Sequence, residues 1–252
     1  MFDLSGKTVL ITGGGSGIGF GISTAFSKAG ANLVLTGRTF SKLENAKEKL
    51  SDGSGEILIM SADGSKEDDI KAVIDAALKK FGRLDVIVNN AQNSASGVLL
   101  KDHSEEDFDR AIYSGLYASF YYMKHAYESL KETKGRVINF ASGAGLFGKS
   151  GQSSYAAAKE GIRGMSRVAA NEWGPDGITV NVICPLAMTE GLENWRKEYP
   201  ELYEKTIDAI PLGRFADPEK DVGGLCVFLS SDNASYITGE TFTLQGGSGL
   251  RP

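Results

Sequence analysis

The sequence predicts an α/β fold in which a parallel sheet carries helices on both of its faces. Short runs rich in β-branched residues alternate with longer amphipathic stretches along all 252 residues. Uninterrupted apolar runs, such as Val9-Leu10-Ile11 and Val86-Ile87-Val88, are typical of strands buried on both faces, as in parallel sheets. No Pro/Ser-rich linker and no internal repeat divides the chain, so we expect one domain over residues 1–252.

Repeated strand–helix units of this kind build a Rossmann-type, doubly wound parallel sheet, here of about seven strands. The expected strands are 7–12, 32–36, 56–60, 85–89, 136–140, 179–183 and 241–244. The expected helices are 17–29, 41–50, 66–81, 105–130, 153–173 and 218–229. Because ligands of such folds bind outside the carboxyl ends of the strands, residues that follow a strand are the first candidates for a site.

Composition narrows the possible partners. The net charge of −5 disfavours nucleic acid and anionic membrane surfaces. No apolar run reaches the roughly 18 residues of a membrane span, and no leader sequence is recognisable, so the expected location is the cytoplasm. There Cys184 and Cys226, both in apolar sequence, are expected to be buried thiols. With His103 and His125 as the only histidines and no metal-ligand spacing, we expect no metal.

A glycine-rich turn follows the first expected strand and precedes the first helix. Glycines let the backbone approach a phosphate, and the helix N-terminus attracts its negative charge. The glycine spacing differs from the usual G-x-G-x-x-G pattern, and a merely flexible turn is the alternative. The position of the turn favours a dinucleotide site formed by Thr12, Gly13, Ser16, Gly17, Ile18 and Gly19.

The end of the second strand bears on the choice of dinucleotide. An acidic residue at this place binds the adenosine ribose of NAD, whereas an Arg accommodates the additional phosphate of NADP. The sequence here is Thr36-Gly37-Arg38, without an acidic residue. NADP(H) is therefore favoured and NAD(H) remains possible; a solvated surface charge is the alternative reading of Arg38. Asp63, after the third strand, is suited to accept a hydrogen bond from the adenine amino group.

Tyr155 and Lys159 are four residues apart in an Ala-rich stretch that favours helix, so they share one helical face. A phenol has a pKa of about 10, and a neighbouring ammonium lowers that pKa. Such a Tyr can exchange a proton with an alcohol or carbonyl oxygen, to which the Ser142 hydroxyl can donate a hydrogen bond. The alternative, on the pair alone, is an ordinary helix with a surface Lys and a half-buried Tyr.

Several motifs follow one another along the chain: the turn at 12–19, Asn89-Asn90-Ala91, Ser142, Tyr155 with Lys159, and the ending Pro211-Leu212-Gly213-Arg214 with Gly246-Gly247. In this order they resemble the short-chain dehydrogenase/reductase family over essentially the whole chain. The resemblance implies reversible hydride transfer between NADP(H) and a secondary alcohol or ketone. It makes Ser142, Tyr155 and Lys159 catalytic, with Tyr155 as proton donor during reduction and Lys159 also on the nicotinamide ribose. It adds Asn89, Ala91, Pro185 and Thr189 to the cofactor site.

The chain departs from the family pattern at three positions. Gln92 follows Asn-Asn-Ala where the family usually has Gly, and Leu186 follows Pro185 where it also has Gly. Gly115 occupies the place of an Asn that supports a water relay to the Lys in the family. The departures put the proton relay, rather than the hydride chemistry, in question. With their flanking residues, they resemble bacterial bile-acid hydroxysteroid dehydrogenases, the 12α-specific group in particular.

The expected lid, residues 186–210, is rich in apolar and aromatic side chains. Such a lid favours a large hydrophobic substrate over a small sugar. The alternative is that these side chains form the core face of two short helices, divided at Pro200. The expected substrate contacts are Gln92, Ser94, Leu186, Met188 and Trp195.

Two other functions compete with a steroid dehydrogenase. A 3-oxoacyl-(acyl-carrier-protein) reductase, or a general carbonyl reductase, shares the predicted fold; the former needs a basic patch for its acidic carrier, and Lys131, Lys134 and Arg136 form only a modest one. A non-catalytic nucleotide-binding scaffold is the second alternative, against which the intact Ser142 and Tyr155 argue. The resemblance also implies a homotetramer formed through the helices at 105–130 and 153–173.

Overall fold

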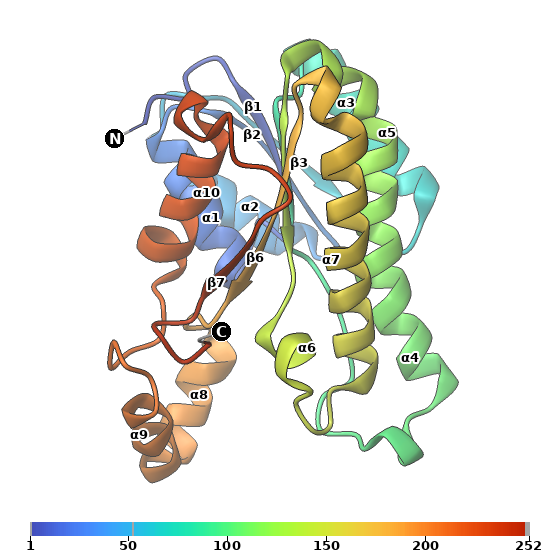
Figure 1. Cartoon of the computed structure of the whole chain (residues 1–252). Coiled ribbons are helices and arrows are strands. Elements are labelled where there is room, and N and C mark those ends of the chain that lie inside the picture. Colours follow the sequence, from blue (N-terminus) through green and yellow to red (C-terminus); the bar gives the residue numbers. More distant parts are fainter. Residues whose placement is uncertain (1, 52, 250–252) are drawn as a thin grey trace.

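The computed structural model describes residues 2–51 and 53–249, and its centre is one seven-stranded sheet (Figure 1). The strands are β1 (Thr8–Thr12), β2 (Asn32–Gly37), β3 (Ile57–Ser61), β4 (Val86–Asn89), β5 (Arg136–Phe140), β6 (Thr179–Pro185) and β7 (Thr241–Leu244). They pair in parallel in the order β3-β2-β1-β4-β5-β6-β7. This order, which reverses between β1 and β4, confirms the predicted doubly wound arrangement.

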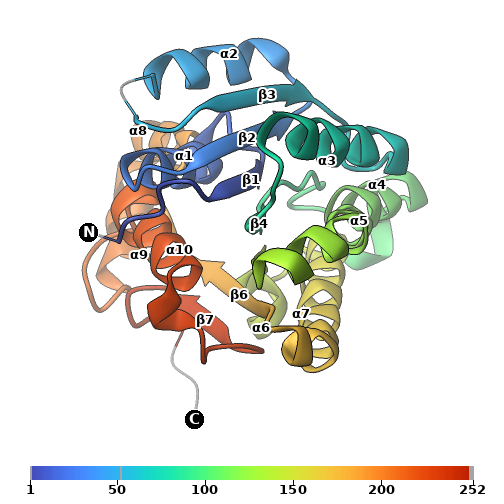
Figure 2. The ribbon, with the colours of Figure 1, turned by 90° about the horizontal axis from the view of Figure 1, so that it is seen from above.

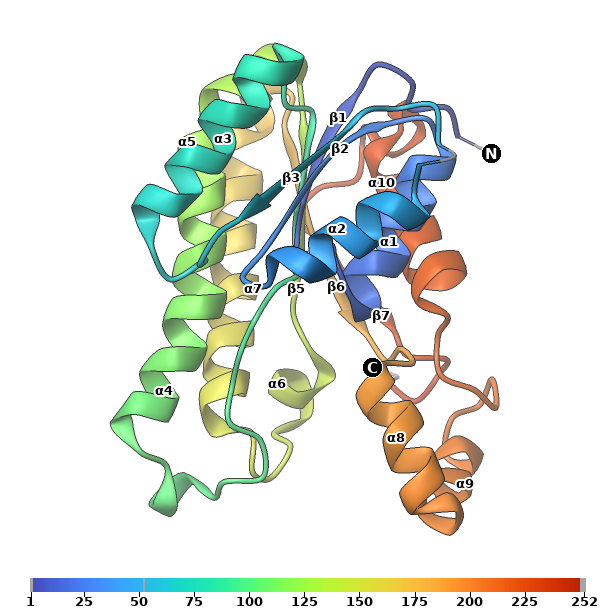
Figure 3. The same cartoon turned by 180° about the vertical axis from the view of Figure 1, so that it is seen from behind.

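Helices cover both faces of the sheet, as Figures 2 and 3 show. One layer holds α1 (Gly17–Lys28), α2 (Phe40–Lys49) and α10 (Gly224–Ser230); the other holds α3 (Glu67–Phe81), α5 (Ala118–Thr133) and α7 (Ser153–Trp173). Neighbouring residues of a strand contact opposite layers. Val9 and Ile11 pack with α1, whereas Leu10 packs with α3 and α5.

Two of the predicted helices are interrupted by π-helical turns. The expected helix at 105–130 is α4 (Glu105–Ala111), a π turn η2 (Ile112–Tyr117) and then α5. The expected helix at 218–229 begins as the π turn η4 (Pro218–Gly223) before α10. Single π turns often occur at functional sites, and η2 lies beside the cavity described below.

The remaining helices are short and lie in the connections. They are η1 (Leu100–Asp102), α6 (Gly143–Phe147), η3 (Gly174–Asp176), α8 (Glu190–Glu198), α9 (Pro200–Asp208) and η5 (Asp232–Ala234). One of them, α6, was not indicated by the sequence: Ser142 caps its N-terminus and Gly148, at φ +65°, ends it. Pro200 begins α9 and divides the two lid helices, as predicted.

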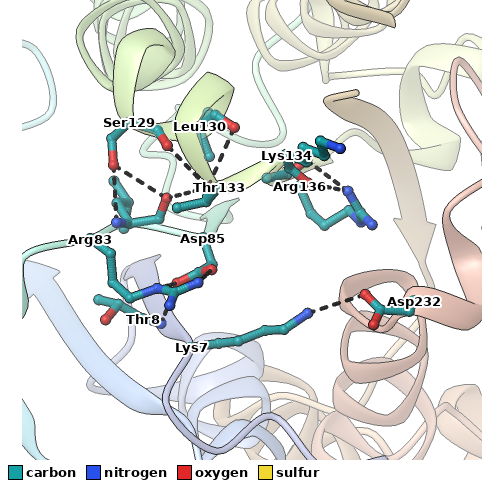
Figure 4. Close-up of polar contacts among 12 residues, drawn as sticks. Lys7, Thr8, Arg83, Asp85, Ser129, Leu130, Thr133, Lys134, Arg136 and Asp232 are labelled. Carbon is teal, nitrogen blue, oxygen red and sulfur yellow. Dashed lines mark hydrogen bonds and ion pairs between the residues drawn. The ribbon is translucent and has the colours of Figure 1, made fainter. Parts of the chain in front are cut away.

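Polar contacts join the amino ends of the strands (Figure 4). The Asp85 carboxylate accepts hydrogen bonds from the Thr8 amide at 2.9 Å and from Arg83 Nε at 2.8 Å. The Arg136 guanidinium donates to the backbone carbonyls of Lys134, Gly135 and Gly177. Arg136 opens β5, so the predicted basic cluster at Lys134 and Arg136 lies at the sheet edge opposite the carboxyl ends.

Cys184 and Cys226 are both buried thiols, as expected. Over the residues that the structure describes, no helix combines the length and the apolar character needed to cross a membrane.

Candidate active site

A cavity of about 410 Å³ lies along the carboxyl ends of β1 to β4. Its wall contains eleven of the predicted site residues: Thr12, Gly13, Ser16, Ile18, Gly19, Arg38, Asp63, Asn89, Ala91, Gln92 and Thr189. The lining does not include Gly17, Ser94, Ser142, Tyr155, Lys159, Pro185, Leu186, Met188 or Trp195. The wall also contains residues that the sequence did not indicate, among them Thr39, Lys42, Asn93, Ser114 and Tyr122.

Two glycines of the glycine-rich turn, Gly13 and Gly19, cannot readily be replaced by a residue with a side chain. A Cβ at Gly19 would lie 2.1 Å from the Gly13 carbonyl oxygen, and Gly13 itself has φ +69°. Ser16 precedes α1 without capping it through its side chain, and the first turn of α1 contains no acidic residue. The amides at this helix start are therefore available to an anion, and the turn fits a dinucleotide phosphate.

Thr12 joins the turn to the end of β4. Its hydroxyl oxygen accepts hydrogen bonds from the amides of Asn90 at 3.0 Å and Ala91 at 2.9 Å. The Asn90 side chain in return donates to the Thr12 carbonyl oxygen at 2.9 Å. These hydrogen bonds hold the cavity residues at the end of β1 against those that follow β4.

The end of the cavity formed by the residues that follow β2 carries positive charge. Arg38 is exposed there, and Lys42, on the first turn of α2, lines the same wall as Thr39. Burial of Asp63 opposes its ionisation, but hydrogen bonds from Ser65 and the charges of Arg38 and Lys66 outweigh burial and lower its pKa. Two cations and a hydroxyl are a suitable environment for a phosphate group.

Asn89, the last residue of β4, has a side-chain oxygen that accepts no hydrogen bond. Its side-chain amide donates to Asn139 Oδ1 at 2.8 Å, while its own Oδ1 is buried without a hydrogen-bond partner. A buried carbonyl oxygen left in this way is costly unless a ligand or water supplies a donor. Because Asn89 lines the cavity, this oxygen is available to a bound cofactor.

Ser142, Tyr155 and Lys159 come together at the carboxyl end of β5. Lys159 is only 3% exposed, its Nζ donates to the Phe140 carbonyl oxygen at 2.7 Å, and it lies 5.5 Å from the centre of the Tyr155 ring. The Ser142 hydroxyl is hydrogen-bonded to the Tyr155 phenol. The Ser142 oxygen also accepts a hydrogen bond from the Ala144 amide at 3.1 Å. The α7 helix starts at Ser153, so Tyr155 and Lys159 occupy its first two turns, as the spacing predicted.

The expected lowering of the Tyr155 pKa is wrong. Burial raises the pKa of Tyr155, and the Ser142 hydroxyl only partly offsets this effect. Burial also lowers the pKa of Lys159 to about 8, so the amine is mainly protonated at pH 7 and loses its proton at mildly alkaline pH. The sequence predicted a phenol acidified by Lys159 because spacing reveals which groups are neighbours but not how deeply they are buried.

The depressed pKa of Lys159 predicts a pH dependence of stability. Between pH 8 and 10 the unfolded chain keeps a proton on this amine that the folded chain has released, so the contribution of Lys159 to the free energy of unfolding rises with pH. We expect Lys159→Met to remove this rise, on the order of 2 kcal/mol across the window. Urea unfolding of both proteins at pH 8, 9 and 10 checks it; parallel curves would contradict it.

The predicted substrate residues of the lid are mainly packing residues. Leu186, Met188 and Trp195 are partly buried against a cluster of Tyr203, Ile210 and Phe215. This arrangement agrees with the alternative of a core between α8 and α9. Gln92 and Ser94 lie in the loop after β4, where Gln92 alone of the two lines the cavity.

Comparison with known proteins assigns the family. A family model described as Enoyl-(Acyl carrier protein) reductase matches residues 13–248. The chain belongs to the short-chain dehydrogenase/reductase family. It is therefore an oxidoreductase of a family that uses a nicotinamide cofactor, and the glycine turn and the unused Asn89 oxygen fit such a cofactor.

Three relatives illustrate the range of this family. The chain is 57% identical over 254 residues to a 12alpha-hydroxysteroid dehydrogenase from a Clostridium species, with 98% of each protein covered. It is 36% identical over 252 residues to the 3-oxoacyl-(acyl-carrier-protein) reductase FabG from Chlamydia muridarum, covering 97% of this chain and 98% of that one. The crystal structure of levodione reductase superimposes with a TM-score of 0.91 at 31% identity, over 99% of both chains.

Proposed function

We propose that the protein transfers a hydride reversibly between NADP(H) and the 12α-hydroxyl, or the matching ketone, of a bile-acid steroid. The observation that carries this proposal is the 57% identity to a 12alpha-hydroxysteroid dehydrogenase over 98% of both chains. The geometry supports it, because Ser142, Tyr155 and Lys159 meet at the end of β5, next to the β4 end that lines the cavity.

In the proposed reaction the cofactor supplies the hydride and the protein moves the proton. During ketone reduction Tyr155 gives its phenolic proton to the substrate oxygen, and its raised pKa keeps that proton in place until then. Ser142 donates a hydrogen bond to the same oxygen and fixes its position. Lys159, held by the Phe140 carbonyl, places a positive charge below the phenol and stabilises the tyrosinate that forms.

Exposed apolar side chains at the carboxyl side of the sheet support a large hydrophobic substrate. They lie at η1, on α6, and in the lid or just after it, on segments below the sheet in Figure 1. These side chains are Leu99, Leu100, Phe147, Tyr199, Leu202 and Leu212. Large apolar side chains left exposed on this side of the sheet are suited to contact a hydrophobic ligand.

The 3-oxoacyl-(acyl-carrier-protein) reductase is the second candidate because of the 36% identity to FabG. An acidic carrier protein would need a basic surface near the catalytic group. Lys134 and Arg136 lie instead at the amino ends of the strands, and Lys131 is paired with Asp176 at 3.1 Å. This placement disfavours the second candidate.

One assay separates the two. Purified protein with NADPH is offered a 12-oxo bile acid and, separately, an acetoacetyl thioester, and loss of nicotinamide absorbance is followed. We expect kcat/KM for the bile acid to exceed that for the thioester by at least about 100-fold, since roughly 3 kcal/mol of apolar contact distinguishes the two substrates. Faster turnover of the thioester would show instead that the protein is an acyl-thioester reductase.

We also infer that the protein works in the cytoplasm as a homotetramer. Tyr113, Tyr117 and Phe120 are exposed on η2 and α5, and Val168 is exposed on α7, which gives both long helices an apolar outer face. Light scattering on the purified protein should give four times the 26.8 kDa chain mass. Phe120→Glu should lower that mass, and an unchanged mass would contradict the use of this face.

A further inference from the structure

Gly115 and Gln92, two positions where the chain departs from the family pattern, are neighbours in the structure. Gly115 is buried in the π turn η2. A Cβ added to Gly115 would lie 2.6 Å from Gln92 Cδ, 2.8 Å from its Nε2 and 2.9 Å from its Oε1. Such distances are too short for real atoms, so the Gln92 amide occupies space that exists only because residue 115 has no side chain.

Of the two polar atoms of the Gln92 amide, only the nitrogen has a hydrogen-bond partner. Its Nε2 donates to the Ala111 carbonyl oxygen, at the start of the π turn, at 3.2 Å. Its Oε1 is buried and has no hydrogen-bond partner, although Gln92 lines the cavity. An unpaired buried amide oxygen beside a cavity can accept a hydrogen bond from a ligand bound there.

A second contact joins the same loop to the same π turn. The Ser114 hydroxyl lies 3.0 Å from the Asn93 amide and 2.9 Å from the Asn93 carbonyl oxygen. On its other side the loop is held by Thr12, through the amides of Asn90 and Ala91. Residues 90–93 are therefore clamped between the glycine-rich turn and the π turn, and all four line the cavity.

We propose that Gln92 and Gly115 act as one positioning pair: the Gln92 amide, seated against Gly115, fixes the loop after β4 and presents its Oε1 to a donor group of the bound nicotinamide cofactor. The identity of that ligand rests on the proposed function. The steric pairing does not, because it follows from the contacts of the protein alone.

The pairing predicts that one substitution has opposite effects in two backgrounds. In the native chain, Gly115→Ala displaces the Gln92 amide and breaks its bond to Ala111, so the melting temperature should fall by roughly 2–4 °C. In a Gln92→Ala background the space is free, and Gly115→Ala should raise the melting temperature, because Ala favours helix over Gly. Gly224→Ala is the matched control: it lies exposed at the start of α10 with nothing within 4 Å of the added carbon, and should stabilise in both backgrounds.

Cofactor affinity tests the positioning role, which melting temperatures do not measure. Titration by NADPH fluorescence should give a Kd about tenfold weaker for Gly115→Ala and for Gln92→Ala, the value of one lost hydrogen bond. The double variant should be no weaker than either, since both changes remove the same contact. Gly224→Ala should bind as the native protein does.

The possible outcomes are distinct. An equal shift of melting temperature by Gly115→Ala in both backgrounds would overturn the pair. The predicted reversal of sign with unchanged NADPH affinity would overturn the positioning role. Failure of every protein, the native one included, to bind NADPH would overturn the proposed cofactor while the melting temperatures still decide the pairing.

Discussion

Tyr155→Phe is expected to abolish useful turnover while cofactor binding survives. The substitution removes the hydroxyl that exchanges a proton with the substrate oxygen, and removal of a positioned general acid typically costs about 10²–10⁴-fold in kcat. The half-buried ring stays in place, so Lys159 keeps its bond to the Phe140 carbonyl and the cavity wall is unchanged. Steady-state kinetics and NADPH fluorescence on the same preparation measure both effects.

Tyr236→Phe is the control for this experiment. Tyr236 is fully exposed near the C-terminal end of the chain, so loss of its hydroxyl should alter neither kcat nor affinity. Native turnover in Tyr155→Phe would remove Tyr155 from the mechanism. A large loss of NADPH affinity in that variant would show instead that the phenol serves cofactor binding.

Arg38→Asp is expected to reverse the cofactor preference. Arg38 and Lys42 give the end of the cavity formed by the residues that follow β2 its positive charge, and a guanidinium can bind a phosphate with two parallel hydrogen bonds. An Asp at this position would repel the phosphate of NADP and could accept hydrogen bonds from the ribose of NAD. We expect the Kd for NADPH to weaken about 100-fold, or roughly 3 kcal/mol, and that for NADH to improve.

Lys47→Asp makes the same charge change on α2, the helix that follows Arg38, but outside the cavity lining, and should leave the ratio of the two Kd values unchanged. If Arg38→Asp bound NADPH as tightly as the native protein, Arg38 would be an ordinary surface charge and the preference for NADP(H) would lose its basis.

Much of the fold could be read from the order of apolar runs. The strands at 136–140 and 241–244 and the helix at 153–173 have the predicted bounds, because a polar or Gly residue directly precedes each of them. The π turns η2 and η4 escaped prediction, since one added residue per turn hardly changes a helical pattern of apolar residues. The helix α6 escaped because five residues rich in Gly and Ala look like a turn.

The lining of the cavity was predicted in part. Residues of the turn at Gly13–Gly19 and after β2 and β4 were indicated because ligand contacts in this fold follow strands, and most of them line the cavity. Lys42 was missed, since it contributes from inside a helix and has no motif of its own. The contact between Gln92 and Gly115 joins positions 23 residues apart, and no local pattern reveals that an absent side chain at one place is filled from the other.

The proposed reaction of this oxidoreductase involves one hydroxyl of a bile-acid steroid and NADP(H). It is tested most directly by following nicotinamide absorbance with NADP+ and two bile acids that differ only in whether carbon 12 carries an α-hydroxyl. We expect NADP+ reduction with the 12α-hydroxylated compound, none with its partner, and much less with NAD+. Equal rates with both compounds, or no reaction with either, would contradict it.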